Sequence, residues 1–128
     1  MEKQEFFGQL ERLGLDTQKA LERFMGNEAL FLSFVERLPE KLDLTHIQQA
    51  LEQGDEAFYM GIHNMKGLAG NLSIEPIFDC TQAMLVEFQA SGFLHRQKLR
   101  ALLRETEEAS RALAKLVEQY LAEGGDRP

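Results

Sequence analysis

Residues 58–73, with the sequence FYMGIHNMKGLAGNLS, carry two patterns that oppose one another. Apolar residues recur at steps of three and four, which is the spacing of the buried face of an amphipathic helix packed on other helices. These residues are Phe58, Ile62, Met65, Ala69 and Leu72. Three glycines, Gly61, Gly67 and Gly70, interrupt the same helix, and each costs about 0.8–1 kcal/mol relative to alanine. We therefore expect a bundle helix whose backbone has to be bare at some positions.

The rest of the chain also follows a helical pattern, and nothing alternates with period two over a useful length, so no strand is predicted. Long segments joined by short turns favour an all-α fold, an antiparallel up-and-down four-helix bundle with short additional N-terminal helices. The four main helices are expected over 27–38, 55–71, 75–91 and 95–122. We expect a single domain over 1–123 and a disordered tail over 124–128.

Short polar residues predict where several helices begin. Asp16, Asn27 and Asp55 are expected N-caps, and Thr45 with Gln48 is expected to form a capping box. In the helix expected before the first proline, the apolar side chains that should face inward are Phe31, Phe34, Val35 and Leu38.

The charge balance argues against two classes of partner. Fourteen lysine and arginine residues stand against 21 aspartate and glutamate residues, so the formal net charge is −7. Because nucleic acids and anionic membranes attract basic surfaces, we expect neither as the main partner. No apolar run approaches the roughly 18 residues that a membrane-spanning helix needs.

The cysteine and histidine content predicts neither a disulfide nor a metal site. The single cysteine, Cys80, cannot pair within the chain, which suits a reducing compartment, and we expect the cytoplasm. The three histidines, His46, His63 and His95, have none of the short spacings that zinc sites use. We therefore expect no metal to be bound by this chain itself.

His63 is predicted to point away from the core of the bundle. On a helical wheel the apolar seam falls within about 40° of its first residue, whereas His63 falls about 140° from that residue. Gly67 lies one turn further along the same outer face and Gly70 two turns, with Lys66 on the flank. Gly61 falls on the inner side, so close helix packing is its better explanation.

An exposed histidine without an acid–base partner is best suited to act as the nucleophile itself. A solvated imidazole is largely neutral at physiological pH and keeps one lone pair free to attack. No carboxylate, serine or cysteine stands three or four residues from His63, so neither an orienting acid nor a second nucleophile is predicted. Gly67 leaves the ring unshielded, and Lys66 brings a positive charge near any negative charge that the imidazole acquires.

Residues 63–72, HNMKGLAGNL, resemble the signature of histidine-containing phosphotransfer (HPt) domains. That signature reads His, any residue, Leu or Met, Lys, Gly, any residue, Ala, a small residue, Asn and an aliphatic residue. The similarity extends upstream to LEQGD at residues 51–55 and, less distinctly, over most of the chain. Ser73 departs from the pattern, because the family usually has glycine there. A small capping residue is expected to serve that helix end.

The resemblance implies a phosphoryl carrier in a multistep His–Asp phosphorelay that starts from a histidine kinase or hybrid kinase. His63 would take a phosphoryl group from the aspartate of a response-regulator receiver domain and pass it to another receiver. Lys66 would interact with the phosphoryl oxygens. The Mg²⁺ and the acidic residues that transfer requires would belong to the receiver, so the chain needs no cofactor and has no turnover of its own.

The surface expected to dock receivers surrounds the histidine. Its residues are expected to be Gly67, Gly70, Tyr59, Met60 and Asn64. Gly67 would let the loops of the receiver reach His63. Tyr59 and Met60 have a second interpretation, as residues at the edge of the core, which the sequence leaves open. We expect the protein to act as a monomer.

Three other functions compete with this hypothesis. The N-terminal phosphoacceptor domain of a chemotaxis-type histidine kinase carries a similar His-x-x-Lys-Gly core, although this chain carries no kinase catalytic segment. A helical adaptor that binds receivers without being phosphorylated is the second, and the presence of His63 argues against it. A hydrolytic enzyme is the weakest, since no His–carboxylate–nucleophile spacing occurs.

Overall fold

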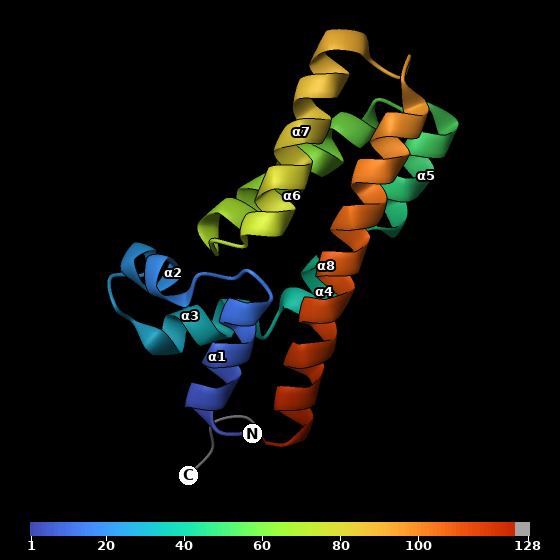
Figure 1. Cartoon of the computed structure of the whole chain (residues 1–128). Coiled ribbons are helices and arrows are strands. Elements are labelled where there is room, and N and C mark those ends of the chain that lie inside the picture. The colour runs from blue at the N-terminus through green and yellow to red at the C-terminus, as the bar shows by residue number, and fades with distance from the viewer. Residues whose placement is uncertain (125–128) are drawn as a thin grey trace.

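The computed structural model describes residues 1–124, and over these residues the chain forms helices joined by short turns, with no strand (Figure 1). The helices, in chain order, are α1 (Lys3–Arg12), α2 (Thr17–Arg23), α3 (Glu28–Val35), α4 (Leu38–Lys41), α5 (Thr45–Gln53), α6 (Ala57–Asn71), α7 (Glu75–Ser91) and α8 (Arg96–Ala122). The all-α prediction is confirmed for this part of the chain. The tail expected over 124–128 lies outside the described residues, except for Gly124.

Helices α5 to α8 gather in the upper part of Figure 1. α6 and α7 form one antiparallel hairpin, α7 and α8 form a second, and α5 contacts both α6 and α8. The helices expected over 55–71, 75–91 and 95–122 are found within two residues of their predicted ends. The segment 27–38, expected to be the fourth main helix, lies with α1 and α2 at the other end of the molecule (Figure 1).

The single helix expected over 27–38 is in fact two, so this prediction was wrong. α3 ends at Val35, and α4 starts at Leu38. Pro39 lies in the first turn of α4, where its missing N–H costs no intrahelical hydrogen bond, so the proline starts a helical turn instead of ending a helix.

The burial expected for this segment is confirmed at three positions and wrong at Phe34. Phe31, Val35 and Leu38 are fully buried, whereas Phe34 is 43% exposed. α3 packs against α2, and its inward face is the narrow one defined by Phe31 and Val35, one turn apart. Phe34 lies on the flank of that face and contacts the ring of Phe24, with the ring centroids 5.1 Å apart.

The predicted N-caps are confirmed at Asp16 and Asn27 but not at Asp55, and the capping box is not found. Side-chain oxygens of Asp16 and Asn27 each accept a backbone N–H from the first turn of the helix that follows. The N-cap of α6 is Glu56, which makes no side-chain cap bond, and the Asp55 carboxylate accepts the Ala57 N–H from one residue earlier.

At Thr45 the cap is the carboxylate of Asp43, which accepts both the Thr45 N–H at 3.0 Å and the Thr45 hydroxyl at 2.6 Å. A carboxylate is the stronger acceptor, so it replaces the hydroxyl in this role. These bonds lower the pKa of the Asp43 carboxyl.

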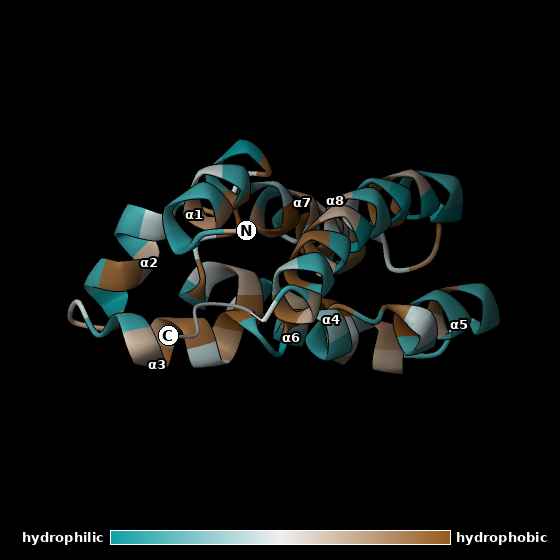
Figure 2. Ribbon diagram, turned by 90° about the horizontal axis from the view of Figure 1, so that it is seen from below, coloured by the Kyte–Doolittle hydropathy of each residue, from teal (hydrophilic) through white to brown (hydrophobic). Residues whose placement is uncertain are grey.

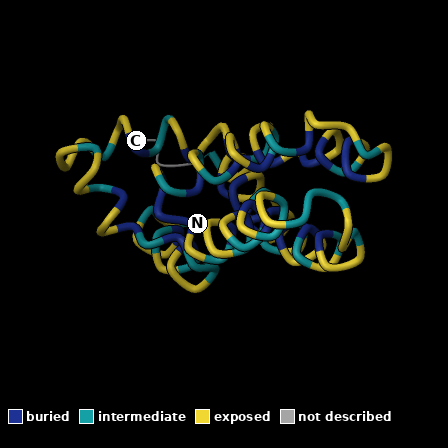
Figure 3. The backbone as a smooth tube through the Cα atoms, turned by 90° about the horizontal axis from the view of Figure 1, so that it is seen from above, coloured by how far each residue is buried: buried dark blue, intermediate teal, exposed yellow. Residues whose placement is uncertain are grey.

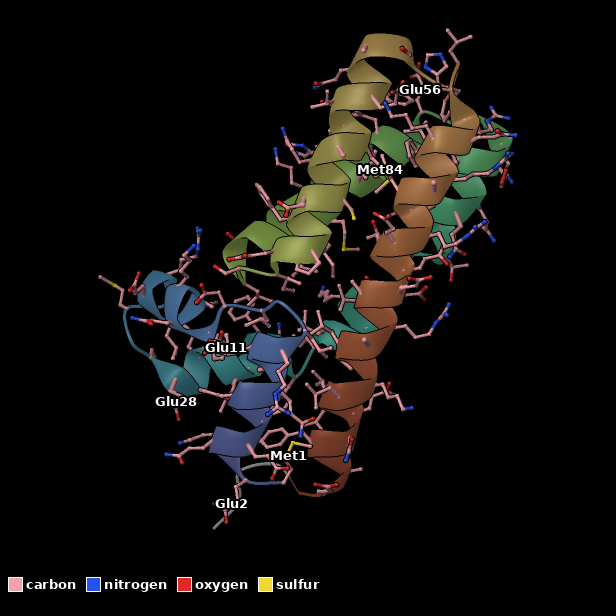
Figure 4. The ribbon with its side chains drawn as sticks, viewed as in Figure 1. Met1, Glu2, Glu11, Glu28, Glu56 and Met84 are labelled. Carbon is pink, nitrogen blue, oxygen red and sulfur yellow. The ribbon has the colours of Figure 1, made fainter. Side chains whose placement is uncertain are left out.

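The core runs between the helices from one end of the molecule to the other. Apolar and buried stretches face neighbouring helices, and polar, exposed stretches face outward (Figures 2 and 3). All five residues of the predicted α6 seam are buried. Met84 of α7 is fully buried and lies between α7 and α8 (Figure 4). Near the C-terminal end of α8, Tyr120 stacks on Phe6 of α1, with the ring centroids 3.9 Å apart.

The loop after α1 is tied to the turn between α6 and α7. The Asp16 N–H donates to the Ser73 carbonyl, and the Glu75 N–H donates to the Gly14 carbonyl, both at 2.9 Å. A side chain at Gly14 would meet the ring of Pro76 at 2.4 Å, so only glycine permits this approach. The N-terminal helices are thereby held against the end of α6.

Ser73 closes the end of α6 through its backbone and not through a side-chain cap, and it is strained. Its N–H donates to the Gly70 carbonyl, and the next N–H, of Ile74, donates to the Ala69 carbonyl. The φ of Ser73 is +52°, in the left-handed region that disfavours residues with a Cβ atom. The residue is 8% exposed, and its hydroxyl has no hydrogen-bond partner among the described residues. The turn geometry forces this conformation, and it gives a physical reason for a glycine at this position.

We expect Ser73→Gly to raise the free energy of unfolding by about 1.5 kcal/mol, because it relieves the left-handed backbone and removes a buried, unpaired hydroxyl. Met25→Gly is the matched control. Met25 has a φ of +57° but is 94% exposed, so its gain should be only about 0.5 kcal/mol. Urea denaturation of both variants measures the difference. A Ser73→Gly variant no more stable than the parent would contradict the assignment of strain.

Candidate functional site

The outer face of α6 presents the histidine that the sequence singles out. His63, Asn64 and Gly67 are exposed, while the apolar seam on the opposite side of the helix is buried. The outward direction predicted for His63 is therefore confirmed. His63 has no hydrogen-bond or ion-pair partner within residues 1–124, so both ring nitrogens face solvent or an incoming molecule.

An aromatic side chain one turn earlier lies against the imidazole. The rings of Tyr59 and His63 are nearly parallel, with an interplanar angle of 12° and centroids 6.2 Å apart. Tyr59 is half-buried and also contacts Phe88 of α7, while its hydroxyl accepts a hydrogen bond from the Gln89 side chain at 3.5 Å. Tyr59 is therefore a residue at the edge of the core that reaches the site, an arrangement that combines the two interpretations the sequence left open.

A hollow opens about one turn before the histidine, between the start of α6 and the end of α7. It has a volume of about 700 Å³ and is lined in part by Glu56, Tyr59, Met60 and Phe88. Met60 is 54% exposed and presents its side chain to solvent at this point. Glu56 marks the same end of the helix in Figure 4. The hollow is mainly apolar and can accept an apolar side chain of another protein.

Lys66 has a partner that sequence reasoning missed. The lysine is half-buried, and its ammonium group lies over the ring of Phe78 of α7, 5.5 Å from the ring centroid. This cation–π contact directs the ammonium toward α7. A Cβ atom at Gly70 would lie 3.6 Å from the same ring, which is an ordinary van der Waals contact. Steric crowding therefore does not require a glycine at this position. In the sequence Phe78 stands out only as an aromatic residue that lies off the predicted buried face of α7. The sequence alone does not indicate that it contacts Lys66.

The glycines of α6 separate into two classes, as expected. A Cβ atom at Gly61 would lie 2.7 Å from Cγ1 of Ile47 on α5, so this glycine allows α5 and α6 to approach closely. A Cβ atom at Gly67 would meet nothing within 4 Å. Packing explains the first glycine, whereas the second leaves open space beside His63.

The chemistry available here is that of a single exposed nucleophile. An imidazole with a free lone pair can attack an electrophilic phosphorus or carbon atom without a separate base. Within the described residues no three His, Cys, Asp or Glu side chains are grouped so that they could hold a metal ion. None of the helices in residues 1–124 combines the length and the apolar character needed to cross a membrane.

No protein-family model, curated protein or solved structure matches this chain. The function is therefore inferred from the motif at 63–72 and from the geometry around His63.

Two alanine substitutions on α6 should move stability in opposite directions. Gly61→Ala should lower the free energy of unfolding by about 1–2 kcal/mol, since the new methyl group collides with Ile47. Gly67→Ala should raise it by about 0.5–1 kcal/mol, because the position is open and alanine favours the helix. Thermal and urea denaturation measure both.

The collision can be isolated with a double variant. In an Ile47→Ala background the cost of Gly61→Ala should largely disappear, because the atom that it meets is gone. Equal costs of Gly61→Ala in both backgrounds would show that the glycine has another role.

Proposed function

We propose that this protein is a histidine phosphotransfer carrier of a multistep His–Asp phosphorelay. His63 accepts a phosphoryl group from the aspartyl phosphate of a receiver domain and passes it to another receiver. The observation that carries the proposal is the exposed imidazole of His63, which has no hydrogen-bond or ion-pair partner within residues 1–124. It lies on the face of α6 opposite the buried seam, and Gly67 leaves open space one turn away. The HPt-like motif at 63–72 supports the same function.

The proposal includes the finer description of the fold as a four-helix bundle. α5, α6, α7 and α8 form the antiparallel up-and-down bundle, and α1 to α4 are the additional N-terminal helices. The pairwise contacts of α5 with α6 and α8, of α6 with α7, and of α7 with α8 support it. In such a bundle a residue opposite the seam of one helix is displayed on a convex surface, which a second protein can cover.

The transfer needs only one nucleophile from this chain. A ring nitrogen of His63 attacks the phosphorus in line with the oxygen of the partner's aspartate. The P–N bond forms as the P–O bond breaks, and the electron pair leaves with the aspartate carboxylate. The negative charge of the phosphoryl group is then held near the Lys66 ammonium. Mg²⁺ and the acidic residues belong to the receiver, so the carrier has no turnover of its own.

The docking surface proposed for receivers is the α6 face around His63. Tyr59 and Met60 border the apolar hollow, and Asn64 is an exposed polar contact. Gly67 leaves open space above the backbone, and Gly70 lies beside the ring of Phe78. A protein seated there excludes water from the imidazole and strengthens the electrostatic contact with Lys66. The proposal includes a carrier that is monomeric and cytoplasmic. Its phosphoryl groups originate from a histidine kinase or hybrid kinase and reach it through a receiver domain.

Incubation with a phosphorylated receiver domain should label the protein with an acid-labile, alkali-stable phosphate. His63→Gln should abolish the label, because it removes the nucleophilic nitrogen while keeping a polar side chain. His46→Gln is the control, since His46 is an exposed histidine on α5 and should leave labelling unchanged. Equal labelling of the His63→Gln variant would refute the proposal. Binding of receivers without any label would instead support the adaptor.

Two neighbours of the histidine should affect transfer without unfolding the protein. Lys66→Ala should slow transfer by about tenfold, as expected for loss of a charge contact of about 1.4 kcal/mol to the phosphoryl group. Gly67→Trp should block transfer by filling the open space beside the ring. Circular dichroism checks the fold of each variant, and Gly67→Ala is the matched control, expected to transfer at near the parent rate. A Gly67→Trp carrier with normal rates would contradict the docking surface.

A further inference from the structure

The side chain of Tyr59 lies between the apolar hollow and the nucleophile. Tyr59 is one of the residues that line the hollow between the start of α6 and the end of α7. Its ring is also nearly parallel to the imidazole of His63, with an interplanar angle of 12° and centroids 6.2 Å apart. No other aromatic ring of residues 1–124 contacts His63. One side chain therefore belongs both to the docking surface and to the surroundings of the reacting ring.

The geometry of the helix brings these two rings together. Residues four apart lie one above the other on the same face of a helix. Long and aromatic side chains on a helix point back toward its N-terminus, over the residue four positions earlier. The imidazole of His63 therefore leans over Tyr59, and the offset parallel arrangement lies within the range of distances that aromatic pairs favour.

The ring of Tyr59 is itself held by α7. It contacts Phe88, with the ring centroids 5.9 Å apart, and its hydroxyl accepts a hydrogen bond from the Gln89 side chain at 3.5 Å. Phe88 packs in turn on Phe58, which is fully buried, and on Phe93, at centroid distances of 5.7 and 4.9 Å. A series of ring contacts thus runs from the core of the molecule to the imidazole.

An exposed side chain that nothing holds moves among several rotamers. No hydrogen bond or ion pair within residues 1–124 fixes the ring of His63, and Tyr59 is the neighbour that restricts it. The attacking lone pair lies in the plane of the imidazole, so an aromatic ring against its face orients the nitrogen without covering it. Transfer in line with the leaving oxygen is faster when the nucleophile is already aligned.

We infer that Tyr59 is a positioning residue, which holds the His63 imidazole in the orientation for in-line attack once a receiver is docked. This inference rests on the proposed function and deepens it, because it gives Tyr59 a role in the transfer step as well as in docking. An apolar side chain of the receiver seated in the hollow contacts Tyr59 and restricts its movement. Docking and alignment of the nucleophile are thereby coupled through one ring.

The test separates the transfer step from docking. Single-turnover experiments with a phosphorylated receiver domain measure the maximal transfer rate at saturating carrier and the carrier concentration that gives half of that rate. If Tyr59 served only for docking, its loss would raise the half-saturating concentration and leave the maximal rate unchanged. A positioning residue changes the maximal rate, because alignment of the ring matters after the receiver is bound.

Tyr59→Leu removes the ring and keeps an apolar side chain at the edge of the core. It should lower the maximal rate by about fivefold, as expected for loss of one aromatic contact. Tyr59→Phe keeps the ring and should restore the rate to within about twofold of the parent. An unchanged maximal rate in Tyr59→Leu would overturn the inference. So would an equal loss in Tyr59→Phe, because the hydroxyl and not the ring would then be responsible.

Phe34→Leu is the matched control. Phe34 is a 43% exposed ring on α3, which lies at the other end of the molecule from the hollow, and it contacts the ring of Phe24 (Figure 1). Its variant should transfer as the parent does. A loss as large as in Tyr59→Leu would attribute the effect to a general loosening of the fold and would overturn the inference.

NMR spectroscopy of the free protein tests the orientation directly and needs no receiver. The side-chain couplings of His63 should show one predominant χ1 rotamer in the parent and in Tyr59→Phe, and an average over rotamers in Tyr59→Leu. Averaged couplings in the parent itself would overturn the inference, since the ring would then not be held. This measurement decides the question even if Tyr59→Leu fails to fold.

The carrier and the positioning role fail separately. Phosphoramidate, a small phosphoryl donor that needs no docking, can approach a moving ring as readily as a fixed one, so it should label the parent and Tyr59→Leu at rates within about twofold of each other. An equal loss with phosphoramidate and with the receiver would overturn the positioning role. If receivers label both proteins at the same maximal rate, the carrier stands and the positioning role is wrong. If no receiver labels the parent, the carrier is wrong, and the positioning role is wrong with it.

Discussion

Burial of one face of α6 is the constraint on which the rest of the structure depends. Phe58, Ile62 and the other seam residues lie in the core, so the opposite face of the helix has to face solvent, and His63 is on it. Because Gly61 has no side chain, α5 can approach α6 closely enough for Ile47 to pack against the α6 backbone. The apolar packing that stabilises the fold thus also sets the direction of the imidazole, to which no residue of 1–124 makes a hydrogen bond.

The turn after α6 links this helix to the N-terminal part of the chain. The loop after α1 forms backbone hydrogen bonds with Ser73 and Glu75, and these bonds place α2 beside the end of α6. The same turn holds Ser73 in a left-handed conformation with its hydroxyl buried. The strained conformation of Ser73 and a cleft lined by Lys19 and Arg23 of α2 therefore both result from the packing of this turn against the N-terminal helices.

Much of the fold follows from local signals. The 3–4 spacing predicted α6, α7 and α8 nearly to their ends, and Asp16 and Asn27 cap helices as expected. The errors arise where several local solutions compete. Asp43 replaces Thr45 as a cap because a carboxylate is the stronger acceptor. The segment 27–38 divides because tertiary packing, and not propensity, decides which short helices stay continuous.

By itself the sequence determined the class of fold, the buried face of α6 and the outward position of His63, since these depend on the period of a helix and on neighbours within two turns. Only the tertiary structure decided that α5 packs against α6, that Lys66 lies over Phe78, and that α2 reaches the turn at Ser73. Those contacts join residues that are distant in sequence. Their pairing depends on how whole helices pack, which no local pattern encodes.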